Sequence, residues 1–156
     1  MMNTIIFFFA SYLIFVALVY ALYVIIRYRS RTFIPTTFVV TTISFVTWAV
    51  CNFFLKNLFA HPRPPVDQAL FIPNDLYSFP SGHAAFMFAL AFAVYAFVGK
   101  GWQVLILLAA FTGIARVLAH VHYWYDIVGS FFFSWVLIFC FVWVCGKSKT
   151  LKKFLQ

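Results

Sequence analysis

The sequence predicts an all-α integral membrane protein, a helical bundle with about five transmembrane helices, on the basis of three observations. First, 65% of the 156 residues are hydrophobic and only 9% are charged. A soluble domain is usually about a quarter charged, so this chain has too few charges to cover a surface that faces water. Second, several apolar stretches reach the length of about 20 residues that spans a bilayer. Third, basic residues flank these stretches, as orientation signals do in membrane proteins. We therefore expect one membrane domain over residues 1–156.

The first two spans are predicted at residues 4–26 and 33–55. No positive region precedes the first span, so we expect a retained helix rather than a cleaved signal peptide. Arg27, Arg29 and Arg31 separate the two spans. The second span is rich in Thr, Val and Phe, which would suit a strand in water. Its length and its lack of charge instead favour a helix in lipid.

A polar segment at residues 56–79 comes before the rest of the bundle. Three further spans are predicted, at residues 81–98, 102–119 and 126–145. Gly99, Lys100 and Gly101 separate the first of these from the second. The three cysteines lie in apolar segments without metal-ligand spacing, so we interpret them as packing residues.

The basic residues predict how the bundle is oriented in the membrane. With five crossings, eight of the 11 fall on one side, namely Arg27, Arg29, Arg31, Lys100, Lys147, Lys149, Lys152 and Lys153. The other side receives Lys56, Arg63 and Arg116. The positive-inside rule then places the C-terminus in the cytoplasm and the N-terminus outside. The segment 56–79 and the turn near 120–125 would face outward, and this distribution of charge does not suggest nucleic-acid binding.

The outward connections hold all four histidines and all three acids of the chain. Charged groups at membrane depth are costly and usually face a cavity or a partner. Three cations that face one cavity need an anion, and phosphate fits, because Arg offers a planar fork and Lys a point charge. An alternative is that Lys56 and Arg63 only extend to the membrane interface. Arg116, near the end of a spanning segment, is harder to explain in that way.

The tetrapeptide Pro80-Ser81-Gly82-His83 opens the third span. Pro and Ser suit a helix start, whose free backbone N–H groups attract anions. Gly82 would let a phosphate approach the backbone closely. A simple helix cap with His83 at the interface is the alternative interpretation.

His122 and Asp126 are four residues apart and would share a face if both were helical. A carboxylate can hold an imidazole in one tautomer and stabilise its positive charge, as a histidine nucleophile requires. Arg116 and His122 do not share a helical face, so we expect a turn between them, within residues 118–124.

In combination, these clusters resemble the type 2 phosphatidic acid phosphatase superfamily. Its pattern is Lys, six residues, Arg-Pro; then Pro-Ser-Gly-His; then Ser-Arg, five residues, His, three residues, Asp. Residues 56–126 show the three motifs in order and with this spacing. Ala115 stands where the family has Ser, from which we expect a modest loss. Family members commonly have six spans, and the predicted N-out orientation agrees with the loss of one.

The resemblance implies a role for each motif residue. His122 would attack phosphorus, Asp126 would orient it, and His83 would protonate the leaving oxygen and then activate water. The phosphate cradle would consist of Lys56, Arg63, Ser81, Gly82 and Arg116. No metal and no cofactor is implied.

Four other polar residues have weaker claims to a role. His61 lies between the first Lys and Arg and is a minor candidate for substrate binding. His120 is an alternative nucleophile, but its spacing to Arg116 and Asp126 does not fit. We expect Asp67 and Asp75 to cap turns or helix starts rather than to act in catalysis.

The resemblance implies an integral lipid phosphatase of the cell membrane, with its site on the extracytoplasmic side and a phosphohistidine intermediate. Undecaprenyl diphosphate is the first choice of substrate, and phosphatidic acid, phosphatidylglycerol phosphate and a sugar-linked lipid phosphate are alternatives. A lipid phosphotransferase, a vanadate-dependent haloperoxidase and a non-enzymatic module that binds or transports a lipid phosphate also remain open. The expected partners are the lipid phosphate substrate and membrane lipids. The oligomeric state is not predicted.

Overall fold

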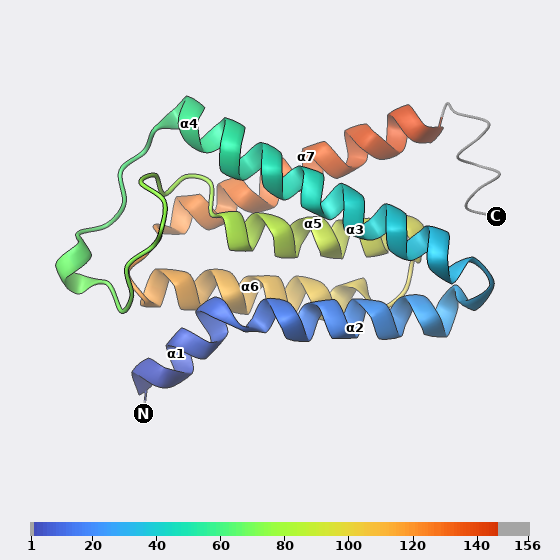
Figure 1. The fold of residues 1–156 in the computed structure, drawn as a ribbon, viewed down its shortest axis with the longest axis horizontal. Coiled ribbons are helices and arrows are strands. Elements are labelled where there is room, and N and C mark those ends of the chain that lie inside the picture. Colours follow the sequence, from blue (N-terminus) through green and yellow to red (C-terminus); the bar gives the residue numbers. More distant parts are fainter. Residues whose placement is uncertain (1, 147–156) are drawn as a thin grey trace.

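The computed structural model describes residues 2–146, and within this range the chain is built from helices. This confirms the all-α prediction. Figure 1 shows long helices lying along the same axis, with the first and the last described residues at opposite ends. The helices are α1 (Met2–Ser11), α2 (Leu13–Tyr28), α3 (Phe33–Ala49), α4 (Lys56–Phe59), α5 (Gly82–Phe97), α6 (Trp102–Leu118) and α7 (Trp124–Gly146). Three short turns join them, η1 (Ser30–Thr32), η2 (Val50–Leu55) and η3 (Val66–Gln68).

The first predicted span consists of α1 and α2, which are bent by 48° relative to each other. The bend lies at Tyr12 and is visible at the N-terminal end of the bundle (Figure 1). Close to it, the backbone carbonyl of Ala10 accepts a hydrogen bond from the Arg116 side chain, at 3.1 Å. A side chain that inserts into the hydrogen-bond ladder is a known cause of a sharp helix kink. This hydrogen bond therefore joins the region of the bend to the end of α6.

The second predicted span is helical, as expected, and does not form a strand. A continuous helical segment of 30 residues, Ser30–Phe59, includes η1, α3, η2 and α4. It extends past the predicted end at residue 55, because η2 is a π-helical turn that leads directly into α4. The helix ends where Ala60 adopts a left-handed conformation, with φ of 46°.

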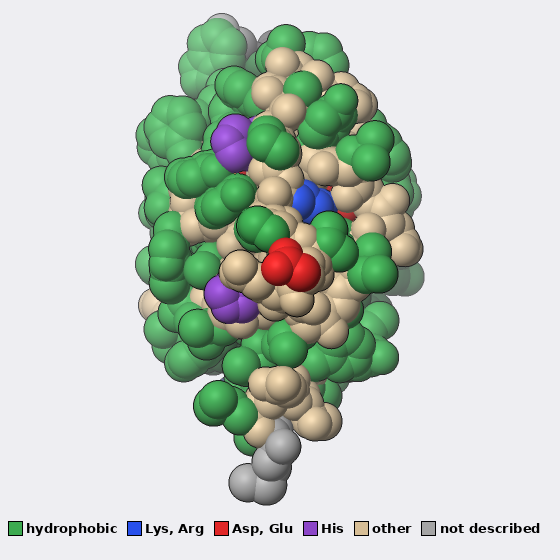
Figure 2. Space-filling model, turned by 90° about the vertical axis from the view of Figure 1, so that its left-hand side faces the viewer, with side chains coloured by type: hydrophobic (Ala, Val, Ile, Leu, Met, Phe, Trp, Pro, Cys, Tyr) green, Lys and Arg blue, Asp and Glu red, His purple; other side chains and the backbone are tan. Residues whose placement is uncertain are grey.

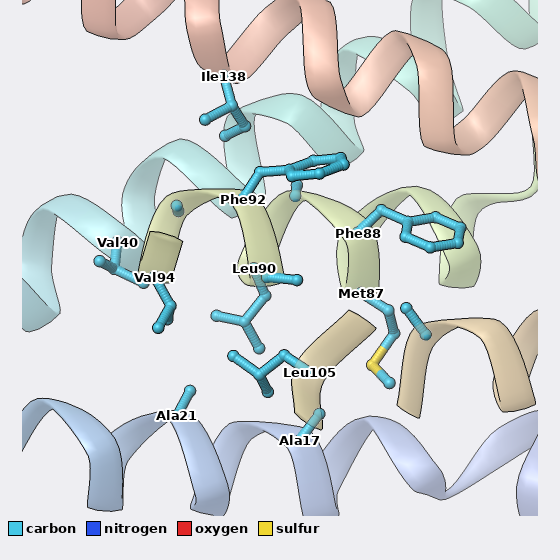
Figure 3. Packing of buried hydrophobic residues seen from close by; sticks show 14 of the residues in the cluster. Ala17, Ala21, Val40, Met87, Phe88, Leu90, Phe92, Val94, Leu105 and Ile138 are labelled. Carbon is cyan, nitrogen blue, oxygen red and sulfur yellow. The ribbon is translucent and has the colours of Figure 1, made fainter. Parts of the chain in front are cut away.

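Helix α5 forms the centre of the bundle and packs against α3, α6 and α7. Small residues at its contacts let neighbouring backbones approach closely, as in membrane helix packing. The buried ones are Ala84, Ala85, Ala89, Ala91 and Ala93. Figure 3 shows the larger side chains of α5 filling the space between them, with Leu90 directed toward Leu105 and α2, and Phe92 toward Ile138.

Two helical segments of the described chain, Ser30–Phe59 and Trp124–Cys145, are long and apolar enough to span a membrane. The bent pair α1 and α2 is a third if it counts as one span. Helices α5 and α6 are apolar but shorter, with 16 and 17 residues. They lie beside the longer segments and run in alternate directions (Figure 1). The exact number of spans therefore stays a prediction.

The basic residues separate between the two ends of the bundle. Arg27, η1 and Lys100 lie near the turns at one end, where α2 meets α3 and α5 meets α6 (Figure 1). Lys56, Arg63 and Arg116 belong to the other end, which also carries the segment between α4 and α5. The remaining basic residues of the prediction, Lys147, Lys149, Lys152 and Lys153, lie outside the described residues.

Candidate active site

A cavity of about 360 Å³ opens at the end of the bundle where α4 ends, α5 begins and α6 ends. Figure 2 views the molecule from this end and shows Lys or Arg surface near the middle of the face, with carboxylate surface beside it. Six of the eight residues proposed from the motifs line the cavity: Lys56, Arg63, Gly82, His83, Arg116 and His122. The other two, Ser81 and Asp126, are fully buried behind this lining.

Lys56 reaches the cavity from the first residue of α4. The π-helical turn η2 precedes it, and such turns often occur at functional sites. Asn52 of this turn also lines the cavity. Lys56 is only 4% exposed, and its ammonium group forms an ion pair with the carboxylate of Asp75. Its charge therefore faces the cavity and not the membrane interface.

Arg63 lies in the segment between α4 and α5 and uses several donors at once. Its Nε donates to the backbone carbonyl of Asp75 at 2.9 Å, and its Nη2 pairs with the Asp75 carboxylate. Its Nη1 donates to the carbonyl of Val121 at 2.6 Å and lies 3.4 Å from Nε2 of His122. Burial lowers the pKa of Arg63 to about 10, so the side chain remains a cation at neutral pH.

Arg116 is 5% exposed and belongs to the last turn of α6. Its Nη1 donates to the carbonyl of Ala10 at 3.1 Å, and its guanidinium carbon lies 5.7 Å from the centre of the Phe71 ring. Its Nε has no hydrogen-bond partner although it is buried. A buried donor without a partner costs free energy, so this N–H group is available to a ligand in the cavity.

The start of α5 contributes Ser81, Gly82 and His83. Ser81 precedes the helix in an extended conformation, and its hydroxyl neither caps the helix nor has any hydrogen-bond partner. A Cβ added to Gly82 would lie 2.8 Å from Oδ1 of Asn52. A side chain at this position would therefore crowd the end of Asn52, and the expected close approach of phosphate stays a prediction. The first backbone N–H groups of α5 have no partner within the helix and are oriented to bind an anion.

His122 and Asp126 form a buried pair, with exposed fractions of 2% and 0%. Nδ1 of His122 lies 3.0 Å from Oδ2 of Asp126. The same carboxylate oxygen accepts a hydrogen bond from the backbone N–H of Tyr123 at 2.9 Å. The Nδ1–H group of His122 therefore donates to Asp126, which leaves Nε2 with a lone pair directed toward the cavity side.

The predicted turn between Arg116 and His122 is confirmed, because α6 ends at Leu118 and α7 begins at Trp124. His122 lies in this turn, whereas Asp126 lies in the first turn of α7. The two side chains therefore meet across the start of α7 and do not share a helical face. Burial and the charges of Arg116, Arg63 and Lys56 lower the pKa of His122 well below 6.5. The site therefore holds a neutral imidazole that can act as a nucleophile.

The other two histidines lie away from the cavity lining. His120 is exposed and adopts φ of 54° in the turn after α6. Nδ1 and Nε2 of His61 lie 3.3 Å and 3.2 Å from the hydroxyl of Tyr125, and Nδ1 lies 3.2 Å from Oγ of Ser78. Neither of these two histidines lines the cavity together with His83 and His122.

Asp75 differs from the expectation that it would cap a turn or a helix start. It lines the cavity and forms ion pairs with both Lys56 and Arg63. Its partners are 19 and 12 residues away in sequence, across a segment without periodic pattern, so no local signal indicated these contacts. Asp67 lies in the first turn of η3 and is exposed, and its expected capping role stays a prediction.

Sequence reasoning also missed part of the cavity wall. Trp48 and Asn52 contribute from α3 and η2, and Ser11 contributes from the end of α1. Within the described residues, no group of three or more His, Cys, Asp or Glu side chains is arranged to hold a metal ion. Most of the charged side chains that line this cavity are cations.

A family model described as the PAP2 superfamily matches residues 38–149, which is more than half of the chain. The chain belongs to the PAP2 superfamily. It is a membrane phosphatase of that family, and the matched region includes every PAP2 motif residue that lines the cavity. The resemblance read from the motifs is thereby confirmed.

Among solved structures, the chain is similar to the first transmembrane PAP2 type phosphatidylglycerolphosphate phosphatase from Bacillus subtilis. The TM-score is 0.59 at 22% identity, and the match covers 95% of this chain and 78% of that chain. This similarity supports the fold of a membrane PAP2 protein. No match was found among curated proteins.

The departure from the PAP2 motif at Ala115 has a structural context. Ala115 is buried and packs in an apolar cluster with Ala10, Ala119 and Val121. Its side chain is directed to α1 and not to the cavity lining. A residue without a hydroxyl group suits this contact between α1 and α6.

Proposed function

We propose that this PAP2 protein is a metal-independent lipid phosphatase that hydrolyses a phosphate monoester or a diphosphate through a phosphohistidine intermediate. The observation that carries the proposal is the buried pair of His122 and Asp126 beside a cavity lined by His83 and three cations. The pair supplies a nucleophile, and the cations supply the charge that a transferring phosphoryl group needs.

In the first step, Nε2 of His122 attacks phosphorus, and the bond between phosphorus and the lipid oxygen breaks. The carboxylate of Asp126, 3.0 Å from Nδ1, stabilises the positive charge that develops on the ring. His83 lines the same cavity and donates its proton to the leaving oxygen. The products are a phosphohistidine and a dephosphorylated or singly phosphorylated lipid.

In the second step, water attacks the phosphohistidine. His83, which lost its proton in the first step, accepts a proton from this water. The bond between Nε2 and phosphorus breaks, inorganic phosphate forms, and His122 returns to its neutral state. Lys56, Arg63, Arg116, the Ser81 hydroxyl and the first N–H groups of α5 hold the phosphate oxygens in both steps. The unpartnered Nε of Arg116 and Oγ of Ser81 support these assignments.

A lipid substrate is supported by a second hollow beside the cavity. Its volume is about 270 Å³, and its walls are largely apolar. It is lined by Ile14, Phe45, Trp48, Gly82, His83 and Phe86. Three of these residues, Trp48, Gly82 and His83, also line the cationic cavity. A phosphate in the cavity would therefore have its lipid chain next to His83, where the leaving oxygen needs a proton.

Undecaprenyl diphosphate remains the first choice of substrate, because the site is proposed to face outward. Phosphatidylglycerol phosphate is the second candidate, favoured by the name of the similar solved structure. The positive-inside rule supports a cell-membrane location with the cavity on the extracytoplasmic side. Transfer of the phosphoryl group to an alcohol would use the same intermediate and differs only in the acceptor.

Phosphate release from lipid phosphates tests this proposal, with purified full-length protein in detergent and EDTA present. His122→Asn is expected to lose nearly all release, and His83→Asn at least about a hundredfold, as loss of general acid–base catalysis costs. His120→Asn is the matched control, because Asn tolerates the left-handed conformation at this exposed position. We expect it to keep most of the wild-type rate.

Either of the first two variants keeping most of its rate would contradict the assigned roles. Loss of release in EDTA by the wild type, restored by a divalent cation, would refute metal independence. Undecaprenyl diphosphate, phosphatidic acid and phosphatidylglycerol phosphate are compared at equal mole fraction in the micelles to rank the substrates.

A further inference from the structure

The Asp75 side chain forms ion pairs with both cations on the loop side of the cavity. One oxygen of its carboxylate, Oδ2, pairs with Nζ of Lys56, and the other, Oδ1, pairs with Nη2 of Arg63. Its backbone carbonyl also accepts a hydrogen bond from Nε of Arg63 at 2.9 Å. Two oxygens on one planar anion thus contact two separate cations, which is the arrangement that two oxygens of a phosphate would adopt.

The charges of the cavity explain why a carboxylate lies there. Lys56, Arg63 and Arg116 line one cavity and repel one another. Asp126 is fully buried and is held by His122 and the start of α7. In the described part of the chain, Asp75 is the one acid that pairs with a Lys or Arg side chain. It therefore reduces the repulsion among the cations when no phosphate is bound.

Arg63 is engaged at the same time with the nucleophile. Its Nη1 lies 3.4 Å from Nε2 of His122, the atom that attacks phosphorus in the proposed mechanism. A phosphoryl group that reaches Nε2 must therefore displace contacts of Arg63. In this structure the Asp75 carboxylate pairs with the cations that an external anion would bind.

The segment around Asp75 is suited to move without disturbing the bundle. Backbone hydrogen bonds hold it at Leu70, which donates to Ala119, and at Ser78, which donates to His61. Between them, Ile72 and Leu76 are 77% and 83% exposed, and the Asp75 side chain is 39% exposed. Segments with few buried contacts open at low free-energy cost. Displacement of Asp75 therefore does not require any helix to shift.

We propose that Asp75 is an internal anion of the phosphate site, which pairs with Lys56 and Arg63 in the empty site, releases them to substrate and competes with product phosphate for them. This inference rests on the proposed function of the same cavity. Inorganic phosphate carries a charge of about −1.5 at pH 7 and would be held strongly by three buried cations. A site that is free of Asp75 only part of the time binds phosphate more weakly, in proportion to that fraction. Asp75 thus promotes product release.

Calorimetric titration of inorganic phosphate into the full-length protein, in detergent with EDTA at pH 7.5, tests this role without any turnover. Asp75→Asn is expected to lower the Kd for phosphate by about tenfold or more, because the competitor is gone and the cations are less neutralised. The matched control is Asp67→Asn, which removes the same charge from the exposed η3 turn of the same segment. We expect its Kd for phosphate to stay within about twofold of the wild-type value, because salt screens the effect of a distant charge.

Asp75→Glu separates competition from loop shape. It keeps the carboxylate, so its Kd should stay near the wild-type value; if Asp75→Glu and Asp75→Asn bind alike, the inference is wrong. An unchanged or weaker affinity in Asp75→Asn would instead show that Asp75 holds the cations in place for phosphate, and would overturn the inference. A wild-type protein that hydrolyses no lipid phosphate refutes the proposed function, while the titration still reports on Asp75.

Discussion

The two ring nitrogens of His122 lie in different surroundings. Nδ1 faces the fully buried Asp126 carboxylate, and Nε2 lies near the cations that line the cavity. The carboxylate fixes the tautomer, while burial and the cations favour the neutral ring. The environment therefore selects both the atom that can attack and the protonation state that it needs.

This environment predicts the acid side of the pH profile. Because the pKa of His122 is lowered well below 6.5, the ring is already neutral at pH 6.5 and becomes protonated only at more acidic pH. We expect the fall of kcat/KM that protonation of His122 causes on the acid side, after correction for the ionisation of the substrate, to begin only below pH 6.5. Profiles of kcat/KM measured with a lipid phosphate in detergent check this outcome. A fall that begins above pH 6.5 would contradict the neutral ring in the free protein.

At the residue scale, the sequence predicted the motif residues well because their spacing reflects fixed chemistry. Lys56, Arg63, His83, Arg116 and His122 all reach one cavity. Asp75 was misassigned, because its ion pairs depend on how an irregular segment folds back over α4. The contact between Gly82 and Asn52 was not predicted, since Asn52 belongs to a π-helical turn that spacing does not reveal.

At the scale of elements, α6 and α7 approach closely just behind the site. A Cβ added to Gly113 of α6 would lie 2.4 Å from Cγ2 of Ile127 in α7, which real atoms do not allow. Arg116 follows Gly113 by one helical turn, and Asp126 is adjacent to Ile127. The contact between these two helices therefore fixes the distance between a cation of the cradle and the partner of the nucleophile.

Gly113→Ala is expected to destabilise the bundle by about 1–3 kcal/mol, as overpacking of a tight contact does, and to reduce phosphate release. The double variant Gly113→Ala with Ile127→Ala should recover part of the stability, because the second change removes the atoms that clash. Thermal unfolding in detergent, measured alongside phosphate release, tests both statements. Simple addition of the two single effects would indicate that the helices adjust without strain.

The elements themselves were largely predictable. Apolar stretches and the Gly99-Lys100-Gly101 break placed all five helical segments near their observed positions. The bend at Tyr12 was not predicted, since no Pro or Gly marks it and its hydrogen-bond partner, Arg116, is 106 residues away. The extension of the second helix through η2 to Phe59 was missed because a π-helical turn has no composition signal.

At the scale of the whole molecule, the basic residues of the described chain lie at two ends, and this separation carries the proposed orientation. An introduced cysteine at each end tests it in intact cells with a membrane-impermeant maleimide. Gln68→Cys, in the exposed η3 turn, should be labelled from outside, whereas Lys100→Cys should be labelled only after permeabilisation. The unmodified chain measures the background from the native cysteines. The reverse pattern would place the cavity in the cytoplasm.

The hydrogen bond from Arg116 to the Ala10 carbonyl has a consequence for how the site is assembled. The family model begins at residue 38, so Ala10 and the rest of α1 lie before the region that defines the superfamily. One arm of the phosphate cradle is nevertheless anchored there. Folding of the shared region by itself would leave that guanidinium without its backbone acceptor, so the complete phosphate cradle forms only after α1 has packed against α6.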